Sequence, residues 1–184
     1  MVRNWIAVAF ALSVAVANTR AAEPVKSGLQ RGDKITTIFE PLNVTGEHAG
    51  EPYCLICENG LAPVAMLFAR EVNEPLLNLL GKLDQATDKH RDQEMGSFVV
   101  FLSDDDGLPK RLAEVAKQRG LKRVVLSTFE PAGPERFKVA ADADLTVVLY
   151  REHEVKANFA FRKGELTEAD GDSVLAALPK ILTK

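Results

Sequence analysis

Four short apolar runs, rich in β-branched and aromatic residues, constrain what this 184-residue chain can fold into. Runs of this kind are typical of strands that are buried on both faces of a sheet. A fifth segment, Glu154–Phe161, alternates apolar and polar residues as a half-buried edge strand does. It follows the last run across a short polar turn, which predicts an antiparallel hairpin. The four runs are Pro63–Phe68, Ser97–Leu102, Lys122–Ser127 and Leu145–Tyr150.

Three further segments carry apolar residues at helical spacing and are bounded by helix-capping residues. Gly120 should end the second of these helices, because glycine readily adopts the left-handed conformation of a helix C-terminus. Pro179 should kink or shorten the third. The predicted starts are Asn73, Asp106–Pro109 and either Thr167 or Asp172.

The predicted order of elements is β-α-β-α-β, a long loop, a β-hairpin and a final helix, which indicates an α/β sandwich with a mixed sheet. In this order the chain resembles the thioredoxin-like superfamily, especially its alkyl hydroperoxide reductase/thiol-specific antioxidant and cytochrome-maturation branches. The resemblance implies a thioredoxin-like three-layer sandwich over residues 34–184. The stretches that carry it are PVAMLFAREVNEPLLNLLGKL, SFVVFLSDDDGLPKRLAEVAKQRGLKRVVLST and ERFKVAADADLTVVLYREHEVKANFAF, which look like the family's central strand and helix, its inserted β-α-β unit and its terminal hairpin.

The first 22 residues are predicted to be a secretory signal peptide. Arg3 supplies the positive charge, Trp5–Ala17 is an apolar run of 13 residues, and small residues suited to cleavage follow up to Ala22. A run of this length is too short for a stable transmembrane anchor, so no membrane contact is expected after cleavage. We therefore expect a secreted or periplasmic protein, with residues 23–33 as a linker to the domain.

The charge balance and the missing motifs narrow the range of partners. Without Arg3 and Arg20, 21 basic residues face 26 acidic ones, a net charge of −5. Nucleic acids and anionic membranes require a basic patch, so neither is expected as a partner. The sequence contains no P-loop and no dinucleotide-binding glycine pattern, and no cofactor is expected.

Cys54 and Cys57 are the only cysteines of the chain. Their spacing usually indicates thiol–disulfide exchange or a soft metal ion. Cys54 and Cys57 are therefore the predicted catalytic residues, and the expected partner is another protein that exchanges disulfides with them. The alternative is a non-catalytic thioredoxin-fold protein that binds a partner protein, or that binds Cu(I) or zinc through the cysteines. Zinc would need further ligands, and His48 is the nearest histidine in the sequence.

The resemblance also implies where the family's own thiol would lie. In thioredoxins and peroxiredoxins the reactive cysteine follows the central strand and opens the next helix, a segment that corresponds here to Ala69–Pro75 and contains no cysteine. Leu145 occupies the position of the family's cis-proline. If the chain is an enzyme, we expect a thiol–disulfide oxidoreductase with a displaced C-x-x-C site and not a peroxiredoxin.

The residues around the cysteines predict a local geometry that would keep the two sulfurs apart. Asn59-Gly60 between apolar residues is a strong hairpin signal, so Tyr53–Glu58 is expected to be a strand that turns there. Residues three apart in a strand are separated by roughly 10 Å and point to opposite faces. A disulfide requires Cα atoms within roughly 7 Å. We therefore expect one buried and one more exposed cysteine with no bond between them, whereas a turn at this place would allow the bond.

Overall fold

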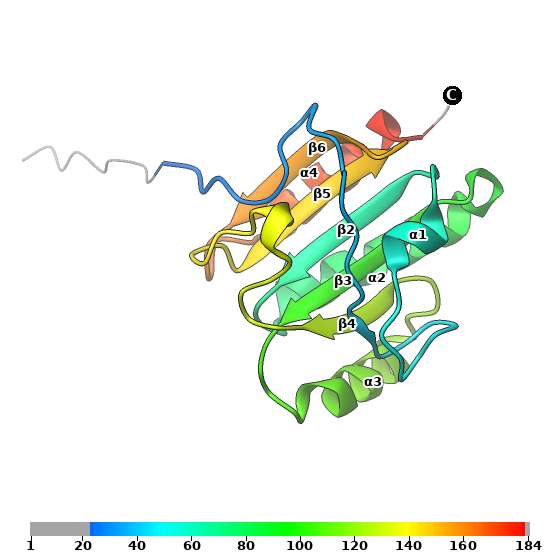
Figure 1. Ribbon diagram of the computed structural model, residues 1–184, viewed down its shortest axis with the longest axis vertical. Coiled ribbons are helices and arrows are strands. Elements are labelled where there is room, and N and C mark those ends of the chain that lie inside the picture. Colours follow the sequence, from blue (N-terminus) through cyan, green and yellow to red (C-terminus); the bar gives the residue numbers. More distant parts are fainter. Residues whose placement is uncertain (1–22, 183–184) are drawn as a thin grey trace, which may run out of the picture.

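A computed structural model describes residues 23–182. The signal peptide predicted for residues 1–22 lies outside the described residues. Within them, six strands form one sheet in the order β1-β4-β3-β2-β5-β6 (Figure 1). The strands are β1 (Leu42–Asn43), β2 (Val64–Ala69), β3 (Gly96–Leu102), β4 (Val125–Phe129), β5 (Leu145–Arg151) and β6 (Glu154–Phe161).

The sheet is mixed, as predicted. Strands β2, β3 and β4 are parallel, whereas β5 pairs antiparallel with β2 and β6 pairs antiparallel with β5. Every residue of β2 is buried. The predicted mixed sheet and the predicted terminal hairpin are therefore confirmed.

The start of β4 differs from the sequence prediction. The run Lys122–Ser127 was expected to be the strand, but β4 begins only at Val125. The reason is a contact with Asp84, which lies in the helix between β2 and β3. Its Oδ1 accepts hydrogen bonds from the backbone N–H groups of Lys122, Arg123 and Val124. These donors are bound to a side chain and cannot take part in the sheet.

The three predicted helices are present with the caps that the sequence indicated. They are α2 (Glu74–Lys89), α3 (Leu108–Arg119) and α4 (Glu168–Ala176). The side chain of Asn73 caps α2, and Thr167 caps α4 in a reciprocal pair with Asp170. Gly120 ends α3 with a φ of 66°. Pro179 follows α4 in a short 3₁₀ turn, so it shortens the helix as expected.

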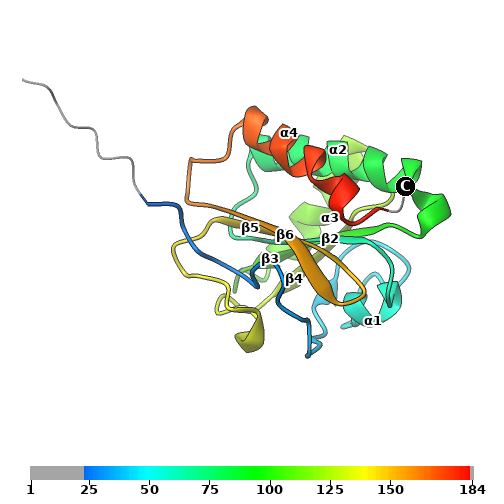
Figure 2. The ribbon, with the colours of Figure 1, turned by 90° about the horizontal axis from the view of Figure 1, so that it is seen from above.

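The helices α2, α3 and α4 lie on one face of the sheet (Figure 2). The parallel connections β2-α2-β3 and β3-α3-β4 step across the sheet in the same direction. Since parallel crossovers have one preferred hand, both place their helices on the same face. The opposite face is covered by a short helix, α1 (Leu55–Asn59), by the 3₁₀ turn η2 (Glu135–Phe137) and by extended chain. The expected three-layer α/β sandwich is confirmed, and its second outer layer is thin.

The extended chain begins in the segment that the sequence indicated as a linker. Residues 23–33 lie against the sheet: Leu29 is buried, and Oγ of buried Ser27 forms a hydrogen bond of 2.6 Å with Oγ1 of Thr146 in β5. The chain then continues as Ile35–Glu40, which we call the crossing segment. Figure 1 shows it passing over the sheet from the β5–β6 side toward β4.

Candidate functional site

Cys54 and Cys57 are joined by a disulfide, with their Cα atoms 5.3 Å apart. Cys54 is the N-cap of α1, and Cys57 lies within this five-residue helix. The prediction that Tyr53–Glu58 is a strand turning at Asn59-Gly60 is therefore wrong, as is the expectation that the cysteines cannot pair.

The Asn-Gly pair ends a helix here and does not form a hairpin turn. The backbone N–H of Gly60 donates to the carbonyl of Ile56, and Gly60 has a φ of 51°. The side chain of Asn59 donates a hydrogen bond of 2.7 Å to the carbonyl of Leu55. Glycine at a helix C-terminus serves the same conformational need as glycine in a hairpin turn, so the dipeptide alone does not separate the two structures.

The two cysteines differ in exposure. Cys54 is buried, at 6% exposed, and belongs to the apolar cluster beneath α1, whereas Cys57 is exposed. The backbone N–H of Cys57 donates a hydrogen bond of 3.1 Å to Sγ of Cys54. Leu55 and Ile56 are buried and hold α1 against the sheet. The expectation of one buried and one exposed cysteine is confirmed, although a helical turn produces it.

The disulfide and Ala69–Pro75, the segment that corresponds to the thiol position of thioredoxins, lie at opposite ends of β2. Helix α1 precedes β2, so the disulfide is near the N-terminal end of the strand (Figure 1). Ala69–Pro75 lies at the C-terminal end and opens α2. Six residues of strand span roughly 20 Å, so the two positions are distinct places on the molecule.

An arginine side chain occupies the C-terminal end of β2. The guanidinium of Arg70 donates hydrogen bonds to the carbonyls of Pro131, Ala143 and Ala140, at 2.8, 3.1 and 3.3 Å. These carbonyls belong to the chain between β4 and β5. Arg70 therefore holds the connection that follows β2 against the connection between β4 and β5.

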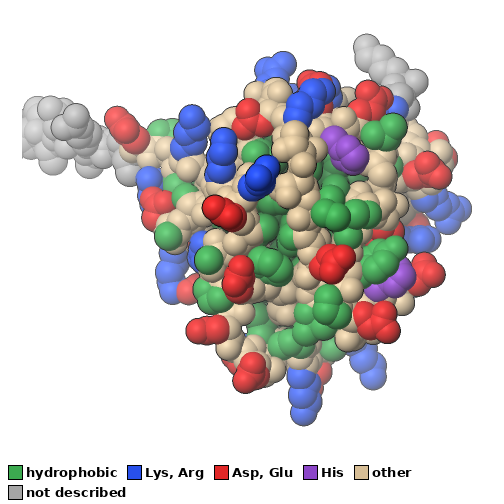
Figure 3. Space-filling model, viewed as in Figure 1, with side chains coloured by type: hydrophobic (Ala, Val, Ile, Leu, Met, Phe, Trp, Pro, Cys, Tyr) green, Lys and Arg blue, Asp and Glu red, His purple; other side chains and the backbone are tan. Residues whose placement is uncertain are grey.

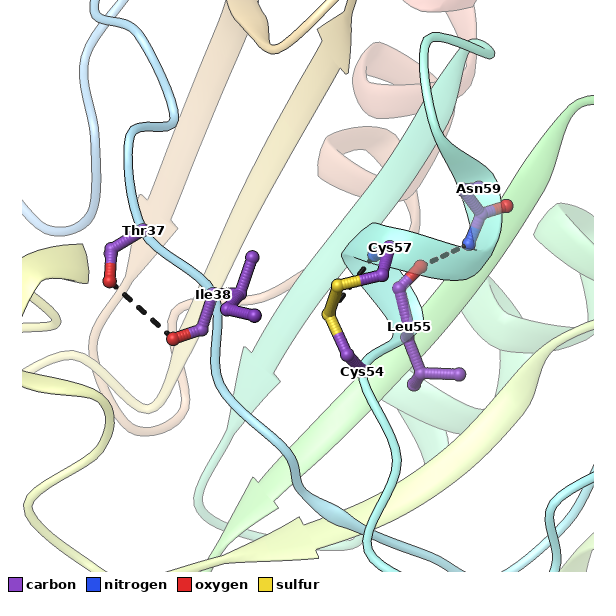
Figure 4. The surroundings of a disulfide bond; sticks show 6 residues. All are labelled: Thr37, Ile38, Cys54, Leu55, Cys57 and Asn59. Carbon is purple, nitrogen blue, oxygen red and sulfur yellow. Dashed lines mark hydrogen bonds between the residues drawn. A yellow bond between two sulfur atoms is a disulfide. The ribbon is translucent and has the colours of Figure 1, made fainter.

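A groove of about 510 Å³ lies beside the disulfide. Figure 4 shows the side chain of Ile38 pointing toward the sulfur atoms of Cys54 and Cys57. The sequence did not indicate this groove, because its walls come from segments that are distant in the chain. The groove is lined by Ile35, Thr36, Thr37, Ile38, Ile56, Cys57, Gly60 and His153.

The structure also bears on the metal alternative. Within residues 23–182, no group of three or more histidine, cysteine, aspartate or glutamate side chains is arranged to hold a metal ion. His48 stacks on Tyr53, with ring centroids 3.5 Å apart. In the oxidised form both sulfur atoms are bonded to each other, so neither is a thiolate ligand.

Among residues 23–182, no helix has the length and apolarity needed to span a bilayer.

No family model matches the sequence, and no curated protein matches it. Solved structures do resemble the fold. A secreted Mycobacterium tuberculosis disulfide oxidoreductase homologous to E. coli DsbE has a TM-score of 0.55 and 10% identity, over 77% of this chain and 93% of its own. Peroxidoxin BcpB from Mycobacterium tuberculosis has a TM-score of 0.62 and 15% identity, over 84% of this chain and 99% of its own.

A third match is the thioredoxin domain of a thiol-disulfide oxidoreductase from Bacteroides vulgatus. Its TM-score is 0.53 with 10% identity, over 79% of this chain and 98% of that domain. At identities this low a likeness shows the fold and not the activity. The element order, the mixed sheet and these matches together show that the chain has a thioredoxin-like fold.

Proposed function

We propose that this protein is an exported thiol–disulfide oxidoreductase, in which the Cys54–Cys57 disulfide exchanges with thiols of another protein. The single observation that carries the proposal is the disulfide with exposed Cys57 lining a groove. The signal-peptide pattern of residues 1–22 supports export to an oxidising compartment, where such a pair can be formed.

The exposure difference assigns separate roles to the two sulfur atoms. An incoming substrate thiolate attacks Sγ of Cys57, because this sulfur borders the groove and Cys54 is buried. The Cys54–Cys57 bond breaks, and Sγ of Cys54 leaves with the electron pair as a thiolate. The backbone N–H of Cys57 already donates to that sulfur and stabilises the developing negative charge.

A second thiolate of the substrate completes the exchange. It attacks the substrate sulfur of the mixed disulfide, a disulfide forms within the substrate, and Sγ of Cys57 leaves as a thiolate. Two electrons and two protons pass in total from the substrate dithiol to the cysteine pair. The disulfide of the folded protein is the only oxidant that this single turnover requires.

The test is the reduction potential of the pair, measured against glutathione buffers, together with oxidation of a reduced dithiol peptide. We expect a potential above about −300 mV and oxidation that both single variants, Cys54→Ser and Cys57→Ser, abolish. With the disulfide form of the same peptide, Cys54→Ser should form a mixed disulfide that mass spectrometry detects: the Cys57 thiolate attacks the peptide disulfide, and the other peptide sulfur leaves as a thiolate. A potential below about −300 mV without exchange would identify a structural bond and refute the proposal. An inert pair whose reduced form binds Cu(I) would support the binding-protein alternative instead.

A further inference from the structure

The backbone of the crossing segment lacks the hydrogen bonds expected of an extended chain. Its ends are fixed, because the N–H of Ile35 donates to the carbonyl of His153 and the N–H of Tyr53 donates to the carbonyl of Pro41. Between these points, residues 36–40 make no backbone–backbone hydrogen bond to any described part of the chain. One of their carbonyls has a side-chain partner: Oγ1 of Thr37 donates a hydrogen bond of 3.5 Å to the carbonyl of Ile38 (Figure 4).

The segment is nevertheless held in position on the sheet. Ile35 is buried at its start. The ring of Phe39 packs against Phe68, Phe129 and Phe137, with centroids 5.9, 5.3 and 5.0 Å away. Ile38 points the other way and is 57% exposed. An extended chain that is anchored by side chains and has unpaired N–H and C=O groups is a template for an added strand.

The crossing segment borders two grooves of different character. The groove on one side, about 560 Å³, is lined by the charged residues Asp33, Lys34, Glu135, Arg136 and Lys138 among others. The groove beside the disulfide has no aspartate, glutamate, lysine or arginine in its lining. Its apolar walls include Ile38 from the crossing segment and Ile56 from α1, and Cys57 of the same helix also lines it. Figure 3 shows hydrophobic side chains gathered on this face of the molecule.

We propose that the groove between the crossing segment and α1 binds an extended polypeptide that carries a cysteine thiol. The peptide backbone would add to residues 36–40 as a strand, because an extended main chain is the partner that satisfies alternating donors and acceptors. An apolar side chain next to its cysteine would lie between Ile38 and Ile56. The inference rests on the proposed function and specifies its substrate class: exported polypeptides that are unfolded around their cysteines.

The experiment compares two thiol substrates on the oxidised protein. One is a linear dithiol peptide with apolar residues beside its cysteines, and the other is glutathione, which is too short to pair along the segment. Ile38→Ser should slow oxidation of the peptide by about tenfold and change the rate with glutathione by less than roughly twofold. Val72→Ser is the matched control, since Val72 is also an exposed apolar residue, at 38%, and lies at the far end of β2.

A second pair of variants tests the main-chain contacts. Neighbouring residues of an extended chain direct their N–H groups to opposite edges, so of Thr36→Pro and Thr37→Pro only one should remove a donor that faces the peptide. We expect one of the two to slow the peptide reaction and the other to resemble the wild type. In the mixed disulfide of Cys54→Ser with the peptide, amide hydrogen exchange of residues 36–40 should slow relative to the free protein.

The outcomes separate this inference from the proposed function. Peptide and glutathione rates that fall together in Ile38→Ser, or a peptide rate that does not change in any of the three variants, would overturn the binding groove while exchange itself remained intact. Unchanged hydrogen exchange in the mixed disulfide would overturn strand addition. A wild-type protein that oxidises neither substrate would instead refute the oxidoreductase.

Discussion

The backbone N–H of Cys57 donates a hydrogen bond of 3.1 Å to Sγ of Cys54. The donor belongs to the exposed cysteine and the acceptor to the buried one. The two sulfur atoms of one disulfide therefore differ both in solvent access and in hydrogen bonding. This difference follows from the N-cap position of Cys54, since the N-cap side chain faces the backbone N–H groups of the first helical turn.

The first prediction concerns the two thiols of the reduced protein. A charged alkylating reagent should modify Cys57 at least about tenfold faster than Cys54, because modification requires an accessible thiolate. Mass spectrometric fragmentation of the peptide that contains both cysteines measures the two rates. In guanidinium chloride the rates should become similar, which is the control. Equal rates in the native protein would contradict the role given to Cys57.

The second prediction concerns the contact between α1 and β3. A Cβ atom at Gly96 would lie 1.7 Å from Oδ1 of Asn59, so Gly96→Ala forces the Asn59 side chain to move. Asn59 would then lose its hydrogen bond to the carbonyl of Leu55. We expect a loss of about 1 kcal/mol in the free energy of unfolding, measured with urea, and faster alkylation of Cys54.

Gly81→Ala is the matched control for this substitution. Gly81 lies in the interior of α2, and a Cβ atom there meets nothing within 4 Å beyond the adjacent backbone of its own helix. Alanine in a helix interior is more favourable than glycine by roughly 0.5 to 1 kcal/mol, so this variant should be slightly more stable than the wild type. Equal effects of the two substitutions would show that the contact with Asn59 does not hold α1.

The sequence predicted those elements whose structure depends on residues that are close together in the chain. The apolar runs located the sheet, and Asn73, Gly120 and Thr167 marked helix ends because capping depends on neighbouring backbone groups. The short helix α1 could not be recognised, since five residues do not display a helical period. The start of β4 was missed because it depends on Asp84, a side chain 38 or more residues away.

The position of the candidate site was partly predictable. The sequence showed that Ala69–Pro75 has no cysteine and that the C-x-x-C pair precedes the central strand. It did not show the groove, since Ile38 and Ile56 come together only when the crossing segment passes α1. Contacts between segments that are distant in sequence have no local signal, and the groove consists of such contacts.

The third prediction concerns how the Glu154 carboxylate on β6 changes the free energy of unfolding in acid. Hydrogen bonds from Lys156 and Lys34 lower the pKa of Glu154 to about 2, from 4.5. The folded state therefore favours the carboxylate. Its stabilising contribution is complete above about pH 4.5 and is lost as the pH falls through about 2.

The measurement is the free energy of unfolding of the wild type and of Glu154→Gln between pH 6 and pH 2. The difference between the two proteins should be largest at pH 6 and should shrink as the pH approaches 2. Glu114→Gln, which alters an exposed carboxylate on α3, provides the control. A constant difference over this range would show that the two lysine contacts do not stabilise the carboxylate.

The fourth prediction concerns Arg70. Arg70→Ala removes the donors of three carbonyl groups, and we expect it to lower the free energy of unfolding by roughly 2 to 4 kcal/mol. Arg70→Lys should recover only part of this loss, because an ammonium group cannot reproduce the planar guanidinium geometry. The control is Arg111→Ala, which removes an exposed ion pair with Asp105 and should cost less than about 1 kcal/mol. Similar urea midpoints for all the variants would contradict the role of Arg70.

The last prediction is that the reduced protein does not turn over hydrogen peroxide rapidly. Peroxide reduction requires an activated thiolate, and Ala69–Pro75 at the end of β2, the segment that corresponds to the thiol position of peroxiredoxins, has no cysteine. Arg70 already binds three carbonyl oxygens there, so this side chain is not free to activate peroxide. Peroxide consumption in excess dithiothreitol should therefore equal that of the Cys54→Ser/Cys57→Ser double variant. Rapid consumption that either single substitution abolishes would show instead that the displaced pair is itself a peroxidatic site.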